Sequence, residues 1–236
     1  MFFYSKQIDE LFADLDGQKN FCHQGVAMFS IPSTPVNNYS KLSGFVRLVP
    51  IRPRYDDDVM ATVAEGFQKP KSPALQKDVH EHLQDCQFAF SFVDAQDTLA
   101  GFALFKVIGN FLYLSGGVLR PAYQGKGLLS VAVLTARSIT GSAFFALRTQ
   151  SSLMWAAGRH LTHEWYPQSG IKIHSMAEMT RQLADKLGMA STIVPGFYGE
   201  ALYGQKPLHK DAKLQAWWDS FVDFDRGDAV LCGGRF

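Results

Sequence analysis

The sequence predicts an α/β domain whose mixed, mostly antiparallel sheet is flanked by helices on both faces. Three apolar segments of strand length, 88–93, 99–107 and 111–118, follow one another with only short polar turns between them, as in an antiparallel meander. The period then changes, because residues 127–140 are apolar nearly all round and predict a buried helix. A further strand is expected over 143–149, and a strand–helix–strand order implies a parallel pair of strands.

The composition is that of a globular protein. Hydrophobic residues make up 47% of the 236 residues and charged residues 19%, so the chain can bury a core as one domain with extensions, or as one domain with a small partner domain. The formal net charge of +1 lacks the basic surplus that nucleic acid or an anionic membrane attracts, so neither is expected as a partner.

The location expected from the sequence is the cytoplasm. Charged residues such as Lys6 and Asp9 interrupt any apolar run near the start, which argues against a signal peptide, and no stretch of about 18 apolar residues predicts a membrane span. The cysteines Cys22, Cys86 and Cys232 are odd in number and far apart in sequence, which is typical of reduced thiols.

The expected organisation is an N-terminal extension, 1–44, packed on a core domain that spans 45–236. The part of this domain from about residue 171 is atypical, because the strands that would complete the sheet come late. Further helices are expected over 5–16, 56–67, 75–83, 152–163, 175–187 and 211–224, and further strands over 26–31, 45–50, 193–202 and 229–232.

The segment LRPAYQGKGLL (119–129) links a predicted strand to the buried helix. Gly125 and Gly127 remove side chains where backbone could approach a ligand. The first turn of a helix has unpaired N–H groups and partial positive charge, which together form a site for a phosphate or pyrophosphate, and Lys126 adds charge at its rim. The segment has neither the GK[ST] ending of a Walker A loop nor the third glycine of a Rossmann loop. The alternative interpretation is an ordinary tight turn before a core helix.

At these residues the sequence resembles the GNAT superfamily of acyl-CoA-dependent N-acyltransferases, whose motif is Q/R-x-x-G-x-G/A. Residues 121, 123, 124 and 127 match, while Leu119 stands where Val is usual and Leu129 replaces the final Gly/Ala. The order of elements supports the resemblance over 45–163, about half of the chain. It implies that coenzyme A or acetyl-CoA binds as cosubstrate, with a neighbouring strand splayed away to admit the pantetheine arm. The implied pyrophosphate site is the backbone of Gln124, Gly125, Lys126, Gly127, Leu128 and Leu129, and the thioester carbonyl is expected at Val118 and Leu119.

The groups that family members often use for proton transfer are missing here. The strand 111–118 has no carboxylate, and the helical position usually held by a tyrosine falls on Gly158. Ser115, beside two glycines that indicate a bulge or the splay point, is one candidate catalytic residue. The other candidates are Tyr166, His160 and His163.

Two histidine patterns have less specific interpretations. His160 and His163 are spaced to face one metal ion, but no third ligand is evident, so no metal is expected. In His80-Glu81-His82 the histidines are two apart, so they do not share a helix face, and the segment is interpreted as a solvated surface.

The function predicted from the resemblance is transfer of an acetyl group from acetyl-CoA to an amine of a small molecule or peptide. Two alternatives stay open: a non-catalytic acyl-CoA-binding or regulatory protein on the same fold, and an interaction module. The sequence leaves open whether the protein forms a homodimer, and it does not specify the acceptor.

Overall fold

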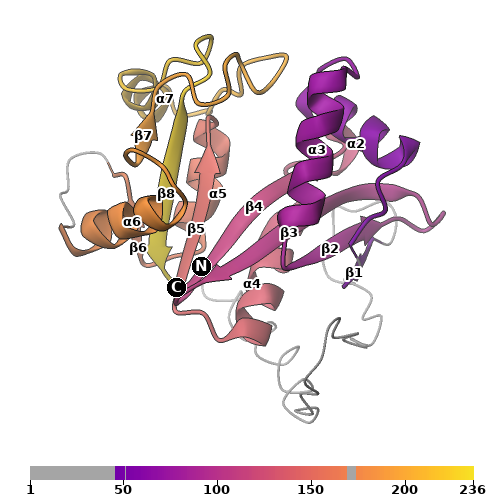
Figure 1. Cartoon of the computed structure of the whole chain (residues 1–236), viewed down its shortest axis with the longest axis horizontal. Helices are drawn as coiled ribbons and strands as arrows, with labels where there is room; N and C mark the ends of the chain where they lie inside the picture. Colours follow the sequence, from indigo (N-terminus) through magenta and orange to yellow (C-terminus); the bar gives the residue numbers. More distant parts are fainter. Residues whose placement is uncertain (1–45, 51, 169–173) are drawn as a thin grey trace. The chain divides into compact units, whose positions relative to one another are not determined.

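The computed structural model describes residues 46–50, 52–168 and 174–236. Its sheet has the strand order β1-β2-β3-β4-β5-β8-β6, and β7 also pairs with β8 (Figure 1). The strands are β1 (Arg47–Val49), β2 (Phe88–Val93), β3 (Leu99–Ile108), β4 (Phe111–Leu119), β5 (Phe144–Thr149), β6 (Glu164–Tyr166), β7 (Ile193–Val194) and β8 (Ala229–Arg235).

The predicted mixed, mostly antiparallel sheet is confirmed. Within the described part of the chain, β4 and β5 are the single parallel pair, and all the other pairs are antiparallel. The parallel pair flanks the buried helix as predicted. The helix expected over 5–16, the strand over 26–31, the extension 1–44 and Cys22 lie outside the described residues.

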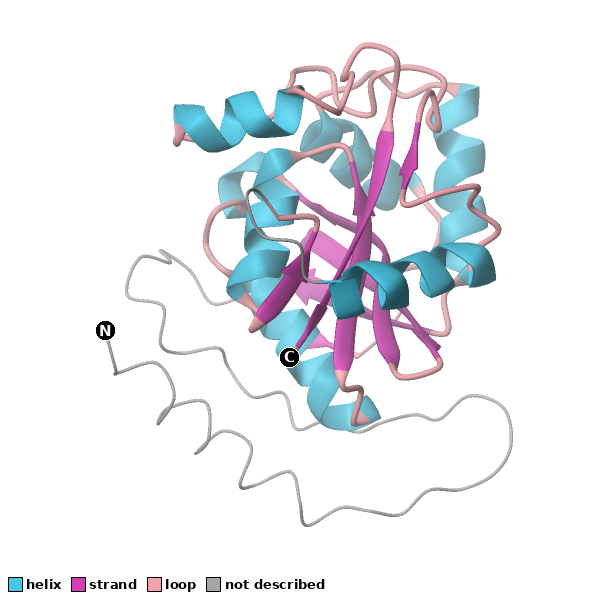
Figure 2. Cartoon of the chain, turned by 90° about the vertical axis from the view of Figure 1, so that its left-hand side faces the viewer, coloured by secondary structure: helices cyan, strands magenta, loops and turns pink. Residues whose placement is uncertain are grey.

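Helices cover both faces of this sheet (Figures 1 and 2). One face packs against α2 (Asp57–Phe67) and α3 (Pro73–Asp85) through Phe102, Leu104 and Val118, and against α6 (His174–Lys186) through Tyr113 and Ala146. The opposite face carries α4 (Leu128–Thr140) and α5 (Ser152–His160), and the short α7 (Ala212–Asp219) contacts α5.

The helix starts follow from the local sequence. Asp56 caps α2 by accepting hydrogen bonds from the N–H groups of Asp58 and Val59, and Ser72 caps α3 with Pro73 in its first turn. Helix α4 differs, because Gly127 stands at its N-cap with a φ of 79° and no side chain caps the first turn. Among these three helices, α4 alone has no side-chain cap, so none of its first N–H groups is satisfied by a side chain.

Three elements differ from the prediction. The helix expected over 211–224 is the shorter α7, which ends at Asp219. The helix expected over 152–163 ends at His160, because the chain then turns to pair with β8: His163 donates its N–H to the Arg235 carbonyl, and β6 follows directly. The strand expected over 193–202 is only Ile193–Val194, and the residues after it form turns beside β4 and β5.

The described helices include none that is long and apolar enough to cross a membrane. Cys86 and Cys232 are buried free thiols, and burial raises the pKa of both.

Candidate active site

The parallel strands β4 and β5 separate part-way along their length. They pair only from Phe111 with Phe144 to Leu114 with Leu147. Beyond this point β4 continues along β3, while its other edge has no strand partner among the described residues. The divergence coincides with a bulge, because Leu104 of β3 faces Gly116 whereas the next residue, Phe105, faces Leu114, which leaves Ser115 as an extra residue. The bulge and the splay point expected at this serine are both present.

A cavity of about 100 Å³, which we call the β4–β5 cavity, lies where the strands separate. Ser115, Gly116 and Gly117 contribute to its wall. The Ser115 hydroxyl is buried without a hydrogen-bond partner, which is costly unless a ligand or water supplies one. The other polar side chains that line the cavity are Asp78, His82, Arg148, Thr149, Tyr198 and Tyr203.

His82 brings an imidazole to the bulge from α3. Its Nδ1 lies 2.9 Å from the backbone oxygen of Asp78 and 3.4 Å from a carboxylate oxygen of the same residue. Because a carbonyl oxygen can only accept, Nδ1 is the donor in this contact, which leaves Nε2 as the ring nitrogen available to a ligand. The Cδ2 atom beside this nitrogen lies 3.7 Å from the point that a Cβ on Gly116 would occupy.

The expectation that residues 80–82 form a solvated surface is therefore wrong for His82. Its side chain is 32% exposed and lines the cavity, whereas His80 is exposed. The reason is helical geometry: His82 follows the buried Val79 by almost one turn, so the face of α3 that packs on the sheet carries the imidazole with it.

Two aromatic residues of the turn after β7 contact Arg148, and one of them, Tyr198, lines the cavity. The guanidinium carbon of Arg148, at the end of β5, lies 4.0 Å from the ring centre of Phe197 and 5.9 Å from that of Tyr198. Burial raises the pKa of Tyr198 to about 12, and burial also raises the pKa of Tyr203, so both phenols stay neutral at neutral pH.

This turn is tied to the start of β8 by a buried carboxylate. Asp228 accepts a 2.9 Å hydrogen bond from the N–H of Gly196, and the Tyr198 N–H donates to the Gly227 carbonyl, also at 2.9 Å. Arg226 donates two hydrogen bonds, of 2.6 and 2.7 Å, to the same carboxylate. The turn that carries Phe197 and Tyr198 is therefore fixed by residues outside the cavity.

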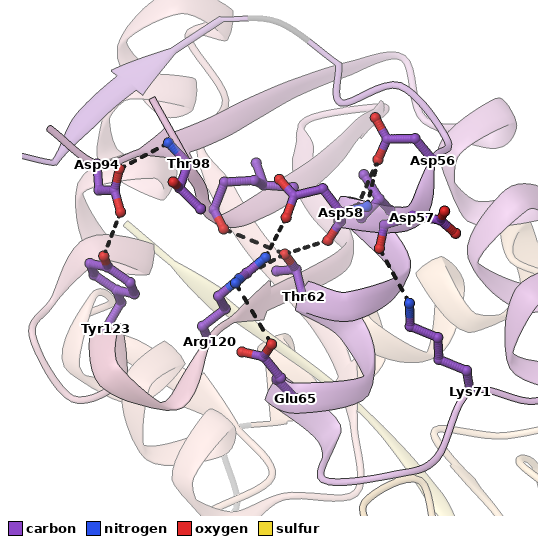
Figure 3. A network of polar contacts seen from close by, with 12 residues as sticks. Asp56, Asp57, Asp58, Thr62, Glu65, Lys71, Asp94, Thr98, Arg120 and Tyr123 are labelled. Atoms are coloured by element: carbon purple, nitrogen blue, oxygen red, sulfur yellow. Dashed lines mark hydrogen bonds and ion pairs between the residues drawn. The ribbon is translucent and has the colours of Figure 1, made fainter. Parts of the chain in front are cut away.

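The segment between β4 and α4 is anchored at two points (Figure 3). Arg120 forms an ion pair with Asp58, lies 3.7 Å from a carboxylate oxygen of Glu65, and donates a 3.1 Å hydrogen bond to the Thr62 hydroxyl. Tyr123 donates a 2.9 Å hydrogen bond to Asp94 in the turn between β2 and β3. These contacts join the segment to α2 and to the meander.

The N–H groups open to a ligand begin after Gln124. The Gln124 N–H donates to the Pro121 carbonyl, and its side-chain amide donates to the Leu119 carbonyl at 2.8 Å, so this residue holds the loop in shape. Gly125 and Gly127 have φ values of 69° and 79°, which side chains rarely adopt, and nothing lies within 4 Å of a Cβ added at Gly125. Open space beside uncapped N–H groups suits a pyrophosphate, and the half-buried Lys126 adds a positive charge there.

Tyr166, His160 and His163, the other catalytic candidates from the sequence, do not line the cavity. Tyr166 lies on β6, which is separated from β5 by β8, and its hydroxyl is 3.1 Å from that of Thr192. His160 is exposed at the end of α5 remote from the cavity, and His163 is exposed after it. We therefore do not retain these residues as catalytic, since no group there could reach a substrate in the cavity. Within the described ranges, no group of histidine, cysteine and acidic residues could hold a metal.

Gly158 has a structural reason for lacking a side chain. A Cβ at this position would lie 2.3 Å from Cζ2 of the buried Trp165. The indole fills the space that a tyrosine at this helical position would need, so the hydroxyl groups near the cavity come from Tyr198 and Tyr203 instead.

The solved structures that match this one include several acetyltransferases. The structure resembles those of GNAT-family N-acetyltransferases. An IAA acetyltransferase from Bacillus cereus is 12% identical, with a TM-score of 0.46, over 80% of this chain and 99% of its own. The ribosomal-protein-S18-alanine N-acetyltransferase from Escherichia coli is 15% identical, with a TM-score of 0.41, over 80% of this chain and 93% of its own. A Bacillus subtilis acetyltransferase in complex with CoA is 15% identical, with a TM-score of 0.43, over 81% of this chain and 99% of its own.

No protein-family model matches the sequence, and no curated protein matches it. The sequence identities and TM-scores are low. The fold is therefore described from the strand order, the single parallel pair among the described strands and the bulge at Ser115.

Proposed function

We propose that this protein is an acyl-CoA-dependent N-acyltransferase that transfers an acetyl group from acetyl-CoA to an amine. The observation that carries the proposal is the combination of two features on one strand. The bulge at Ser115 opens β4 away from β5, and the same strand leads into the uncapped glycine loop at the start of α4. Together they offer a groove for an extended thioester arm and an anion site at its end.

In this proposal the loop holds the pyrophosphate through N–H groups from Gly125 to Leu129. The edge of β4 that faces away from β3 is left for the pantetheine arm, because no described strand pairs with it beyond Leu114. A backbone N–H near Val118 or Leu119 would then polarise the thioester carbonyl, as expected from the sequence.

The residues of the β4–β5 cavity supply the proton transfers. An acyl-CoA brings an activated thioester with a thiol leaving group. As the amine nitrogen forms its bond to the carbonyl carbon and the carbon–sulfur bond breaks, Nε2 of His82 accepts the proton that the amine loses. Tyr198 or Tyr203, neutral because their pKa values are raised, can hydrogen-bond to the leaving sulfur. A thiol has a pKa of about 8.5, so a thiolate leaving group needs less help from a proton donor than an alkoxide would.

A non-catalytic acyl-CoA-binding protein is the second candidate. The observation that favours it is Gly158, where Trp165 excludes the side chain that family members often use as acid. This candidate shares the loop and the groove but needs neither His82 nor a tyrosine in the cavity.

Coenzyme A binding and turnover separate these candidates. We expect calorimetry to detect binding of coenzyme A to the natural protein, and Gly127→Glu to abolish it, because a carboxylate would occupy the phosphate position. Gly127→Ala is the matched control, since it adds the strain of a side chain at φ 79° without the charge, and we expect it to retain measurable binding.

Absence of binding to the natural protein at millimolar coenzyme A, or equal affinity in the glutamate variant, would contradict both candidates. Thiol release from acetyl-CoA with a panel of amines supports the enzyme. Binding without any thiol release supports the second candidate.

A further inference from the structure

The β4–β5 cavity holds a buried arginine, Arg148, whose guanidinium hydrogen-bonds to the Tyr198 hydroxyl but has no carboxylate in contact with it among the described residues. Arg148 forms no ion pair with a carboxylate of the described residues, and its Nε is buried without a hydrogen-bond partner. An unpaired buried charge costs free energy, so such a group is commonly matched by a bound ion of opposite charge. The guanidinium therefore marks a subsite for an anionic group of a ligand.

Neighbouring residues fix the position of the Arg148 guanidinium. Its guanidinium stacks on Phe197 at 4.0 Å, and β5 is paired there with Leu231 of β8. The neighbouring Tyr198 is a neutral phenol and does not cancel the charge. A planar guanidinium presents parallel N–H groups that match the two oxygens of a carboxylate.

The wall formed by α3 carries the complementary chemistry. Asp78 and His82 line it, and the carboxylate of Asp78 makes no ion pair with Arg148 across the cavity. The cavity thus presents a carboxylate and an imidazole from α3 and a guanidinium from β5. This arrangement is complementary to a small molecule with an amino group at one end and an anionic group at the other.

The remaining lining is apolar and aromatic. A ligand that places its two polar groups on the walls must bury the rest of its surface against hydrocarbon, which favours an apolar substituent. The apolar lining comes from Val63, Phe67, Leu104, Leu114, Met154 and Leu202.

We propose that the acceptor is a free α-amino acid with an apolar side chain, whose carboxylate is held by Arg148 and whose amino group faces His82 and the bulge at Ser115. This inference rests on the proposed acyltransferase function and specifies its acceptor. The amino group would lose its proton to His82 as the new carbon–nitrogen bond forms. The products would be an N-acyl amino acid and the free thiol.

Matched ligands test the role of the carboxylate. Calorimetry of the full-length protein with saturating coenzyme A would compare L-phenylalanine with phenethylamine, which differs by loss of the carboxylate, and L-leucine with isopentylamine. We expect each amino acid to bind at least tenfold more tightly than its amine. In Arg148→Met this preference should disappear, and Arg148→Lys should restore part of it. Arg137→Met is the matched control, because Arg137 lies on α4 against Phe236, outside the cavity.

The outcomes separate the inference from the proposed function. Equal or tighter binding of the amines, with thiol release from acetyl-CoA, would overturn the amino-acid acceptor and leave the acyltransferase standing. The inference is also overturned if coenzyme A binds but neither amino acid binds at millimolar concentration. Failure to bind coenzyme A would refute the proposed function. A preference for the amino acids over the matched amines that depends on Arg148 would still support the carboxylate subsite. Far-ultraviolet circular dichroism of each variant confirms that a lost preference is not lost folding.

Discussion

Replacing Asp228 by asparagine should both destabilise the fold and loosen one wall of the cavity. The carboxylate is fully buried and accepts four hydrogen bonds, from the backbone N–H groups of Gly196 and Asp223 and from two guanidinium nitrogens of Arg226. An amide keeps the shape but loses the charge, and its NH₂ group would face donors. The change therefore tests how strongly this carboxylate fixes the turn that carries Phe197 and Tyr198.

The expected loss of stability follows from the pKa of the Asp228 carboxylate. Its hydrogen bonds with Arg226, followed by those with the two backbone N–H groups, lower the pKa of Asp228 to about 2. A free aspartate has a pKa of about 3.9, and each pKa unit corresponds to about 1.4 kcal/mol, so ionisation of Asp228 stabilises the folded state by about 2.6 kcal/mol at neutral pH. Since the folded pKa is depressed, this contribution is complete above the unfolded pKa and is lost as the pH falls through the folded one. About half should be gone at pH 3.

Urea unfolding of the natural protein and of Asp228→Asn, at pH 7 and pH 3, measures this contribution. We expect the variant to be less stable by about 2.6 kcal/mol at pH 7 and by about half as much at pH 3. Asp225→Asn is the control, because Asp225 is exposed and close in sequence, and it should leave the stability unchanged at both pH values. A difference that is as large at pH 3 as at pH 7 would refute the assignment to the ionised carboxylate.

Three further outcomes are expected. His82→Ala should lower the rate of thiol release by about 10²–10⁴-fold with unchanged coenzyme A affinity, because it removes the proposed base; His80→Ala is the control on the exposed face of the same helix, and equal rates in both would exclude His82. Gly158→Ala should cost about 1–3 kcal/mol in urea unfolding, because its Cβ would overlap Trp165, and an unchanged midpoint would contradict the packing described. Tyr166→Phe and His160→Ala should keep the natural rate of thiol release, and a tenfold loss in either would return that residue to the mechanism.

The elements predicted most successfully are those that local pattern specifies. The switch from two-residue alternation to the apolar helix after Gly127 predicted the parallel pair, and the glycines after Ser115 predicted the bulge. Both features arise from neighbours in sequence. The loop between them was recognised for the same reason, since its glycines and its position before a helix are adjacent residues.

The residues proposed for catalysis and acceptor binding were missed because long-range packing brings them together. His82, Arg148 and Tyr198 are far apart in sequence, and each is placed by a separate event: α3 packing on the sheet, the end of β5, and the attachment of a turn to Asp228. Tyr166 was one of the catalytic candidates from the sequence, and it follows the helix after β5. The chain instead turns there into β6, on the far side of β8, which no local pattern indicated.

The residues proposed to bind coenzyme A and those proposed to bind the acceptor come from separate segments of the chain. The coenzyme loop and the bulge lie within 115–129, whereas the aromatic wall beside Arg148 comes from residues 197–203 and is held by Asp228 near the C-terminal strand. Substitutions in that wall can reshape the space for an amine while leaving the coenzyme loop intact. Exchange of residues 197–203 would therefore be the direct way to redirect this protein to a different acceptor without rebuilding its coenzyme site.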